Sequence, residues 1–596
     1  MVKDRLKSLR QVMQQEKVDY YLIPTDDPHG SEYVGESFKC REFITGFTGS
    51  AGTALIWQEG AGLWTDARYH IQAQKQLKGS GITLFKEGME DVPSLYDFLK
   101  ENLREGQCLA ADGAVISESQ AEKLQSLARE KQAFFRDCGD LTDRVWKDRP
   151  ARSAHPVCLL PPEISGVGTE EKIAYIRDKM REKGADLLVL SVLDEICWLF
   201  NIRGSDIPMS LLPLAFAVVE EKRASLYLQK SAWNEKMLQW ALKHGIETKI
   251  YDDIYGDLAR ISAGRRIWAD QERVNRKLFQ SLDGAARVIS ESSPVEPAKA
   301  VKNETELQNF RKAHLKDGAA VTRFLFWLKK HVGKEKITEI SAAKKLEEFR
   351  REWDSYLLPS FDPIVAYQDH GAVVHYSASQ DTDRELEAAG FLLMDTGGQY
   401  REGTTDITRT VALGLLSEKQ KEHYTRVLMG NLRLAALTFP YGCSGENLDL
   451  AARLSLWEAG LDYQHGTGHG VGFLMNVHEG PQAVRWRHRT GSAVTVLEEG
   501  MVVSNEPGIY IEGEYGIRLE NLLICRKKEK NDFGRFMNWE VLTLVPFERE
   551  AVLTGLMGNR ERDLLNAYHA VVREKLLPMM KTEEERDWLQ DATKAL

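Results

Sequence analysis

Five side chains of metal-binding type occur in the last third of this 596-residue chain, each in a short motif of its own. They comprise four carboxylates and one imidazole: Asp395, Asp406, His469, Glu506 and Glu520. This oxygen-rich set suits a pair of Mn²⁺ or similar divalent ions better than a thiolate-rich structural zinc site. Two carboxylates can bridge the ions while the other ligands fill terminal positions. We therefore interpret the set as a hydrolytic site with two metal ions.

The separate motifs leave more than one interpretation open. Asp395 stands two residues before a pair of glycines, and Asp406 follows eleven residues later. A tight turn beside an exposed acid explains this spacing as well as a ligand pair does. His465 and His469 stand four residues apart in a glycine-rich segment, where backbone and ligand can approach closely. A plain surface loop is the alternative, and only the combination of all the motifs favours the metal site.

The hydrophobic pattern around these residues predicts strands, which would hold the ligands rigidly. The predicted strands cover residues 391–394, 409–413, 501–504 and 517–524. The first two place Asp395 and Asp406 on one hairpin, and the last two carry the glutamates. A helix that opens with a capping box is predicted over residues 417–439, and a second helix is predicted to end at Gly460.

An internal repeat organises the first half of the chain. The same spacing of apolar residues, typical of an amphipathic helix, occurs twice: Leu6, Leu9 and Met13, then Ile173, Ile176 and Met180. Each predicted helix leads into an apolar, strand-like run, at residues 18–23 and 185–190. Helix-then-strand units repeated in this way predict two α/β domains of one type.

Breaks in the apolar pattern predict three domains, at residues 1–150, 151–298 and 299–596. The first break is a polar stretch with two prolines at residues 143–156, and the second is the segment 292–297. After it, Thr305 and Gln308 resemble a capping box that opens a long helix. The third domain, which carries the five ligands, begins there.

Composition excludes several classes of protein. Charged residues make up 28% of the chain and hydrophobic residues 43%, as in ordinary soluble globular proteins. The net charge of -10 gives no basic surface for nucleic acid, so no nucleic-acid partner is expected. No apolar run is long enough for a membrane span, and no secretory signal is recognisable. Seven scattered cysteines without a CxxC pair indicate reduced thiols, which predicts a cytoplasmic protein.

The motifs taken together resemble those of pita-bread metallopeptidases, and the whole chain resembles the three-domain aminopeptidase P (Xaa-Pro aminopeptidase) family. The matching segments are residues 40–53, 64–69, 373–376, 394–398, 405–410, 465–472, 476–481, 506–508 and 516–521. The resemblance implies an α/β fold with two related creatinase-N-type domains followed by a C-terminal pita-bread catalytic domain. It also implies a homodimer.

The resemblance implies a metallo-exopeptidase that removes the N-terminal residue from peptides with proline in the second position. Asp406 and Glu520 would bridge two metal ions, Asp395 would bind one ion, and His469 with Glu506 would bind the other. Water or hydroxide between the ions would attack the scissile carbonyl, with Glu506 as proton acceptor. Mn²⁺ is the implied metal, while ligand chemistry also admits Co²⁺ or Zn²⁺.

Family positions further imply roles for three more histidines. His375 and His478 would flank the scissile bond and donate to its carbonyl oxygen or to the oxyanion, and His465 would help to hold the substrate. A histidine satisfied within the core is the ordinary alternative for each of these residues taken alone.

Three substrate-binding residues are also expected by resemblance. Tyr510 and Arg518 match positions near the metals, although a packed phenol and a structural ion pair explain them too. Arg68 would meet the downstream peptide, and a salt bridge to Asp66 or Glu42 explains it almost as well.

Other members of the fold are alternatives. A creatinase-like enzyme works without metals and should lack several of the five ligands, and prolidase or methionine aminopeptidase would lack the duplicated extension. A pita-bread binding module that has lost catalysis is the competitor from another class, but its ligands would be eroded. The intact set of ligands therefore favours an enzyme.

Overall fold

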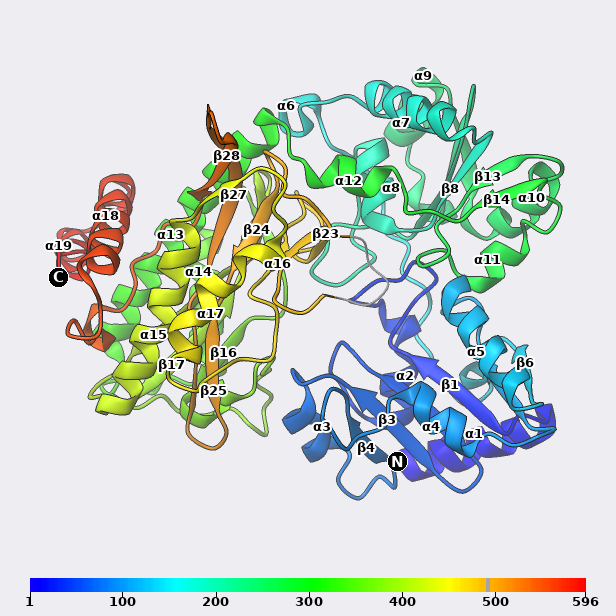
Figure 1. Ribbon diagram of the computed structural model, residues 1–596, viewed down its shortest axis with the longest axis horizontal. Helices are drawn as coiled ribbons and strands as arrows, with labels where there is room; N and C mark the ends of the chain where they lie inside the picture. The colour runs from blue at the N-terminus through cyan, green and yellow to red at the C-terminus, as the bar shows by residue number, and fades with distance from the viewer. Residues whose placement is uncertain (489–493) are drawn as a thin grey trace. The chain divides into compact units, whose positions relative to one another are not determined.

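The computed structural model describes residues 1–488 and 494–596, and the chain divides into two compact units (Figure 1). Unit 1 comprises Met1–Pro161 and Val167–Glu296, and unit 2 comprises Pro162–Gly166 and Pro297–Leu596. Among the described residues, no helix combines the length and the apolar character that a membrane span requires.

Unit 1 contains two six-stranded sheets of identical topology. The first has the order β4 (Thr83–Lys86), β3 (Ala61–Thr65), β2 (Thr53–Trp57), β1 (Tyr20–Pro24), β5 (Cys108–Ala111) and β6 (Phe134–Asp137). The second has the order β12 (Ile246–Ile250), β11 (Ala224–Leu228), β10 (Ala215–Glu220), β8 (Leu187–Leu190), β13 (Arg266–Trp268) and β14 (Arg287–Ile289). In each sheet two inner strands pair antiparallel on one side and parallel on the other: β1 and β3 in the first sheet, β8 and β11 in the second. The predicted repeat of α/β domains is confirmed.

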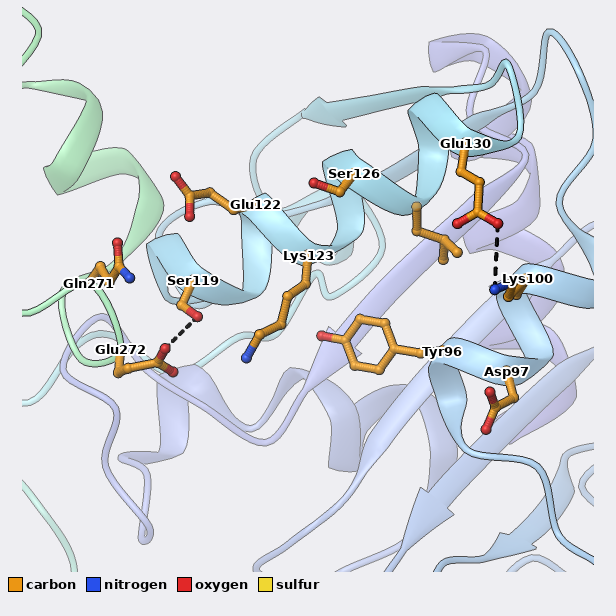
Figure 2. A pocket seen from close by; sticks show the side chains of 11 residues that line it. Tyr96, Asp97, Lys100, Ser119, Glu122, Lys123, Ser126, Glu130, Gln271 and Glu272 are labelled. Atoms are coloured by element: carbon orange, nitrogen blue, oxygen red, sulfur yellow. Dashed lines mark hydrogen bonds and ion pairs between the residues drawn. The ribbon is translucent and has the colours of Figure 1, made fainter. Parts of the chain in front are cut away.

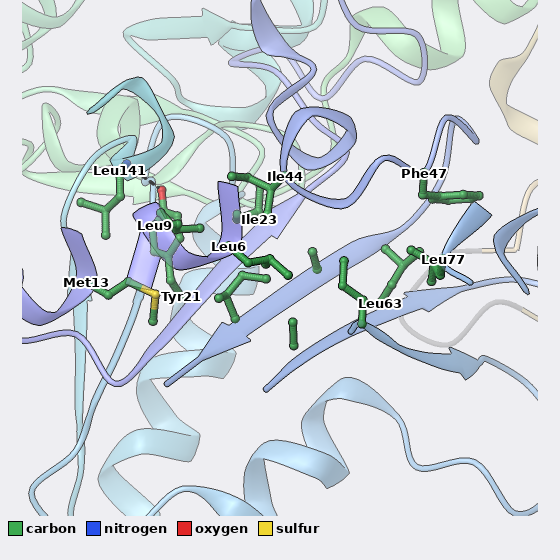
Figure 3. Close-up of a cluster of buried hydrophobic side chains, with 14 of the residues drawn as sticks. Leu6, Leu9, Met13, Tyr21, Ile23, Ile44, Phe47, Leu63, Leu77 and Leu141 are labelled. Atoms are coloured by element: carbon green, nitrogen blue, oxygen red, sulfur yellow. Dashed lines mark hydrogen bonds between the residues drawn. The ribbon is translucent and has the colours of Figure 1, made fainter. Parts of the chain in front are cut away.

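Both faces of the first sheet are covered by helices. The helices are α1 (Val2–Glu16), α4 (Leu95–Asn102) and α5 (Glu118–Glu130). Leu6 and Leu9 of α1 pack with Tyr21 and Ile23 of β1 in one cluster, which Figure 3 shows. The alternate residues of β1 join a second cluster with α4 and α5. This alternation is the period of two that a strand buried on both faces requires.

The two halves of unit 1 are joined by polar contacts at the start of α5. The hydroxyl of Ser119 donates to Glu272 at 2.6 Å, a contact drawn in the pocket of Figure 2. The backbone N–H of Ser119 donates to the carbonyl of Gln271 at 2.9 Å. In addition, His29 bonds the carbonyl of Ser191 and the hydroxyl of Tyr251, at 2.8 and 2.7 Å. These bonds link segments far apart in the sequence.

Unit 2 surrounds its sheets with long helices. Its sheets contain β15 (Tyr356–Pro359), β16 (Ile364–Tyr367), β17 (Phe391–Thr396), β18 (Gly398–Tyr400), β19 (Gly403–Thr404), β20 (Ile407–Ala412), β21 (Thr438–Pro440), β22 (Gly468–Gly470), β23 (Glu479–Val484), β24 (Val502–Asn505), β25 (Gly508–Ile511), β26 (Tyr515–Arg518), β27 (Asn521–Asn531) and β28 (Gly534–Val541). Its main helices are α13 (Glu304–His331), α14 (Glu339–Arg351), α15 (Glu418–Ala435), α17 (Leu450–Trp457), α18 (Asn559–Leu576) and α19 (Glu583–Ala592). The largest sheet has the order β21-β28-β27-β24-β22-β23, and β16-β17-β20 form a smaller one.

Three predicted element ends are wrong. The cap of α13 is Asn303, not Thr305, because the Asn303 side chain accepts the Glu306 N–H and Glu306 bonds back. The helix predicted over residues 417–439 ends at Ala435, since the following residues form the edge strand β21. The strand predicted over residues 517–524 is interrupted between β26 and β27.

Buried neutral histidines of unit 2 predict acid sensitivity. His314 in α13 and His569 in α18 are fully buried, and burial lowers the pKa of His314 to about 4 and of His569 to about 3. The unfolded chain, with histidine pKa near 6.5, binds more protons below that pH. The free energy of unfolding should therefore fall from pH 6.5 towards pH 4, by up to about 1.4 kcal/mol per pH unit for each histidine.

The variant His314→Met isolates one of these contributions. Methionine adapts to a buried site and does not titrate. Urea unfolding of chelator-treated protein, at several pH values between 6.5 and 4.5, should give a shallower pH dependence for the variant than for the parent. Equal slopes would contradict this account.

Candidate metal centre

The five predicted ligands come from different segments of unit 2 that pair with one another. Asp395 lies in β17, where it stands opposite Thr408 of β20, so that Asp406 falls just before the returning strand. The Glu520 N–H donates to the Thr408 carbonyl at 3.1 Å, and the Glu506 N–H donates to the carbonyl of Thr467, two residues before His469, at 2.8 Å. Glu506 therefore follows the end of β24, as predicted, whereas Glu520 lies between β26 and β27 and not within a strand.

Ligand atoms of Asp406, His469 and Glu520 lie within 4.8 Å of one another. Nε2 of His469 is 3.4 Å from Asp406 Oδ2 and 3.6 Å from Glu506 Oε1. Nδ1 of His469 lies 2.9 Å from the Gly470 carbonyl, which requires the proton on Nδ1. The hydrogen-bond network thus leaves the Nε2 lone pair directed at the carboxylates, as a metal ligand needs.

The carboxylates strongly perturb one another. Burial, followed by the charges of Asp395 and Glu506, raises the pKa of Asp406 well above its usual value. Burial, followed by the charge of Asp406, does the same to the pKa of Glu520. Burial and the charge of Glu520 raise the pKa of Glu506 to about 7. Such crowding of acids in a buried site is typical of functional centres.

The residues fit a pair of divalent cations. Within the described residues, Oδ1 of Asp395 and Oδ1 of Asp406 are buried and receive no hydrogen bond. A buried carboxylate oxygen without a donor is costly, and a cation removes that cost. Hard oxygen donors with one imidazole suit Mn²⁺ or ions of similar chemistry.

Arg518 connects Asp395 to His465 through Tyr510. The Arg518 guanidinium donates to Asp395 Oδ2 at 2.6 Å and to the Tyr510 hydroxyl at 2.7 Å. The same hydroxyl lies 2.9 Å from Nε2 of His465. Because the hydroxyl accepts from arginine, its own proton goes to His465, whose Nδ1 then donates to Gly466 at 2.7 Å. The structure thus brings three predicted site residues into one network with a ligand.

The other two predicted histidines are also in unit 2. The ring of His478 stands nearly perpendicular to that of His469, with centroids 4.3 Å apart. His375 is half-buried, and the carbonyl of the preceding Val374 accepts a bond from Arg518 at 3.4 Å. Their roles towards a substrate stay predictions.

Arg68 belongs to unit 1. Its Nε and Nη2 donate to the two oxygens of Asp66, at 2.9 and 2.7 Å. The sequence suggested Glu42 as an alternative ion-pair partner of Arg68. The second acidic partner is instead Glu32, at 3.9 Å. The role of Arg68 in substrate binding stays a prediction.

Buried arginines, to which the motifs assign no role, hold the ligand-bearing segments. Arg409 donates to the carbonyl of Glu520 at 2.6 Å. Arg453 donates to the carbonyl of His465 at 2.8 Å and pairs with Asp449 at 2.6 Å. Each arginine is at most 1% exposed. Because five donors leave each guanidinium, one side chain can fix several carbonyls at once.

A third arginine fixes the turn between the two aspartate ligands. Arg350 pairs with Asp317 at 2.7 Å and donates to the Gly397 carbonyl at 3.2 Å. Asp317 in turn accepts from the Thr405 hydroxyl, immediately before Asp406. Arg409 lies in a motif of the sequence, but nothing in the sequence marks Arg350 or Asp317.

Family models match nearly the whole chain. Residues 308–527 match metallopeptidase family M24, and residues 535–596 match the C-terminal region of that peptidase family. Residues 5–145 and 148–306 each match a creatinase/prolidase N-terminal domain.

Individual proteins match over similar lengths. A probable Xaa-Pro aminopeptidase P of Neurospora crassa is 38% identical over 96% of this chain and 86% of its own length. The crystal structure of X-prolyl aminopeptidase from Caenorhabditis elegans, described as a cytosolic enzyme with a di-nuclear active site, matches with a TM-score of 0.96 at 32% identity over all of both chains. An Xaa-Pro dipeptidase from Bacillus anthracis covers 64% of this chain and 99% of its own, with a TM-score of 0.51 at 28% identity. The chain therefore belongs to the aminopeptidase P family of M24 metallopeptidases and is a hydrolase.

Proposed function

We propose that this protein is a metal-dependent aminopeptidase that removes the N-terminal residue from peptides with proline in the second position. The observation that carries the proposal is the convergence of Asp406, His469 and Glu520 within a chain that matches Xaa-Pro aminopeptidases over its full length. The shorter Bacillus anthracis dipeptidase matches only 64% of the chain, which favours the aminopeptidase over a dipeptidase.

We propose that two divalent ions, of manganese, occupy the site. Asp406 and Glu520 are assigned as bridging ligands, Asp395 as a ligand of one ion, and His469 with Glu506 as ligands of the other. The two buried oxygens without a donor and the di-nuclear site of the C. elegans enzyme support a pair of ions. Co²⁺ and Zn²⁺ are compatible with the same ligands.

The chain's own groups supply binding and proton transfer. When bound, divalent ions polarise the scissile carbonyl and lower the pKa of the attacking water. Glu506 is assigned to accept the proton that this water loses. His375 and His478 are assigned to donate to the carbonyl oxygen as its negative charge develops. His465, Tyr510 and Arg518 form the network that borders the substrate.

A bond to proline explains why metal chemistry serves here. The proline nitrogen carries no hydrogen, so an enzyme that grips the scissile N–H loses its contact. Polarisation of the carbonyl avoids this dependence. We assign Asp395 and its ion to bind the free amino terminus of the peptide, which would restrict cleavage to the first peptide bond. We assign Arg68 to bind the part of the peptide that follows the scissile bond.

We also propose the remaining features expected from the family. The chain comprises domains 1–150, 151–298 and 299–596 and works in the cytoplasm, as the C. elegans enzyme is described to do. No nucleic acid or membrane is required as a partner.

The first prediction concerns metal dependence. Chelator-treated protein should release arginine from Arg-Pro-Pro only after Mn²⁺ is added, and Asp406→Asn should abolish release, because one bridging carboxylate is lost. Free arginine measured by chromatography gives the result, with Asp532→Asn, an exposed acid of the same unit, as control. Cleavage of the dipeptide Arg-Pro but not of Arg-Pro-Pro would indicate a dipeptidase. If no arginine is released from either peptide with any metal, the protein would be better explained as a binding module.

The second prediction concerns the oxyanion. His478→Ala should lower kcat for Arg-Pro-Pro by about 100-fold, because one preplaced donor is removed, and should change KM little. Calorimetric Mn²⁺ titration of the variant tests whether the neighbouring ligand His469 is undisturbed. A parental kcat with unchanged Mn²⁺ affinity would remove His478 from the mechanism.

The third prediction concerns the homodimer, which we assign to the exposed face of α17. Leu450, Leu454 and Trp457 recur on one side of this helix and are 50%, 40% and 38% exposed, and Trp486 adds a ring 6.0 Å from Trp457. Contiguous exposed apolar side chains of this kind mark association surfaces.

Trp457→Glu should convert the dimer to a monomer, because it places a charge in an apolar contact. Molar mass by light scattering measures the change. Leu242→Glu, at an equally apolar and 84% exposed position of unit 1, should leave the dimer intact. A parent protein that is already monomeric, or dissociation by both variants, would contradict the assignment.

A further inference from the structure

Glu339 is a fully buried carboxylate outside the metal-binding set. It is the first residue of α14, and its side chain has no exposed surface. The N-terminus of a helix favours a negatively charged side chain at this position. A buried carboxylate needs hydrogen-bond donors for its lone pairs. The segments that supply these donors indicate which part of the structure the carboxylate holds in place.

All four donors to Glu339 come from one segment, residues 367–384. Oε1 accepts the backbone N–H of Tyr367 at 2.7 Å and a bond from Nδ1 of His370 at 2.8 Å. Oε2 accepts the hydroxyl of Tyr376 at 2.9 Å and the backbone N–H of Arg384 at 3.3 Å. The carboxylate therefore ties the beginning, the middle and the end of this segment to the start of α14.

The segment carries His375 between two anchored neighbours. Val374 is held by Arg518, which also pairs with the ligand Asp395, and Tyr376 is held by Glu339. The ring of Tyr376 packs in an apolar cluster of unit 2, so the hydroxyl bond fixes an already enclosed side chain. The anchor at Val374 connects the segment, through Arg518, to the ligand Asp395. The anchor at Tyr376 connects it to Glu339, which is remote in the sequence.

We propose that Glu339 is a positioning residue for catalysis, which acts by fixing the backbone on which His375 is presented to the scissile carbonyl. The inference rests on the proposed function, because it assigns the orientation of a histidine that this function uses. A donor misplaced by a fraction of an ångström loses much of its effect on a developing oxyanion, so fixing the segment contributes to turnover. A change at Glu339 is therefore expected to affect turnover and not substrate or metal affinity.

A double-mutant cycle tests the proposal. Glu339→Gln should lower kcat for Arg-Pro-Pro by roughly 10- to 100-fold and change KM by less than about threefold, since a transition-state donor is displaced. In a His375→Ala background the same substitution should cost no more than about twofold, because residues that act through one another are not additive. Multiplicative losses in the two backgrounds would overturn the proposal.

Two variants separate positioning from simple folding. Tyr376→Phe removes one hydroxyl bond to Glu339 and keeps the ring, so it tests the proposal even if Glu339→Gln does not fold. The kcat of this variant should fall by about 3- to 10-fold. An unchanged kcat would overturn the proposal. Glu348→Gln removes an exposed charge from the same helix, where Glu348 pairs with Lys345 at 2.8 Å away from the segment, and should keep the parental kcat.

The parent protein distinguishes the two levels of inference. If the parent with Mn²⁺ releases no arginine, the proposed function fails, and the positioning role fails with it. If the parent is active and Glu348→Gln lowers kcat as much as Glu339→Gln does, only the positioning role fails. Mn²⁺ affinity should be the same in every variant of the series, and a loss confined to Glu339→Gln would also overturn the positioning role.

Discussion

Repulsion among four crowded carboxylates, of which Asp395, Asp406 and Glu520 are buried, is the constraint on which the catalytic unit depends. Burial and the neighbouring acids raise the pKa of Asp406 and Glu520, and a single guanidinium, Arg518, bonds to Asp395. The fold cannot gain stability from such a cluster by itself, because each charge loses its hydration and faces like charges. Binding of divalent cations is the physical reason to keep these groups together, and folding and metal affinity are therefore linked.

Buried arginines hold the segments that carry these carboxylates in place. They donate hydrogen bonds to backbone carbonyl oxygens and not to the side-chain oxygens of the ligands. Arg409 and Arg453 bond the carbonyls of Glu520 and His465, and Arg350 bonds the turn after Asp395. Binding the carbonyl leaves the side chain of the ligand available for a cation. Removal of one partner from a buried ion pair leaves an uncompensated buried charge. Substitution of one of these arginines or of its acidic partner should therefore destabilise the unit strongly.

The sequence was sufficient to predict the repeated α/β domains, because the helix-then-strand pattern is local, and its motifs nominated the residues of a candidate site. The apolar spacing of Leu6 and Leu9 survives as α1, and Asp395 lies on β17 while Asp406 immediately precedes its partner strand β20. Ligand-bearing motifs are short, so their residue types can be interpreted without a fold. Family resemblance then supplied roles that spacing alone left open.

The residues that the sequence did not mark act across long separations. Asp317 and Arg350 are 33 residues apart, and Glu339 meets Tyr376 across 37. No local pattern distinguishes such a buried carboxylate from an ordinary charge on a helix, since only tertiary packing removes its water. Glu520 was placed on a strand for a related reason, because an apolar run does not reveal that its ladder is interrupted.

The most direct test of the account is an anomalous-scattering crystal structure of the Mn²⁺-loaded protein. The account predicts two manganese peaks, both contacting Asp406 and Glu520, with Asp395 at one ion and His469 with Glu506 at the other. A single peak, or two ions that share neither Asp406 nor Glu520, would contradict the central claim that the buried carboxylates are held together to bind a pair of cations.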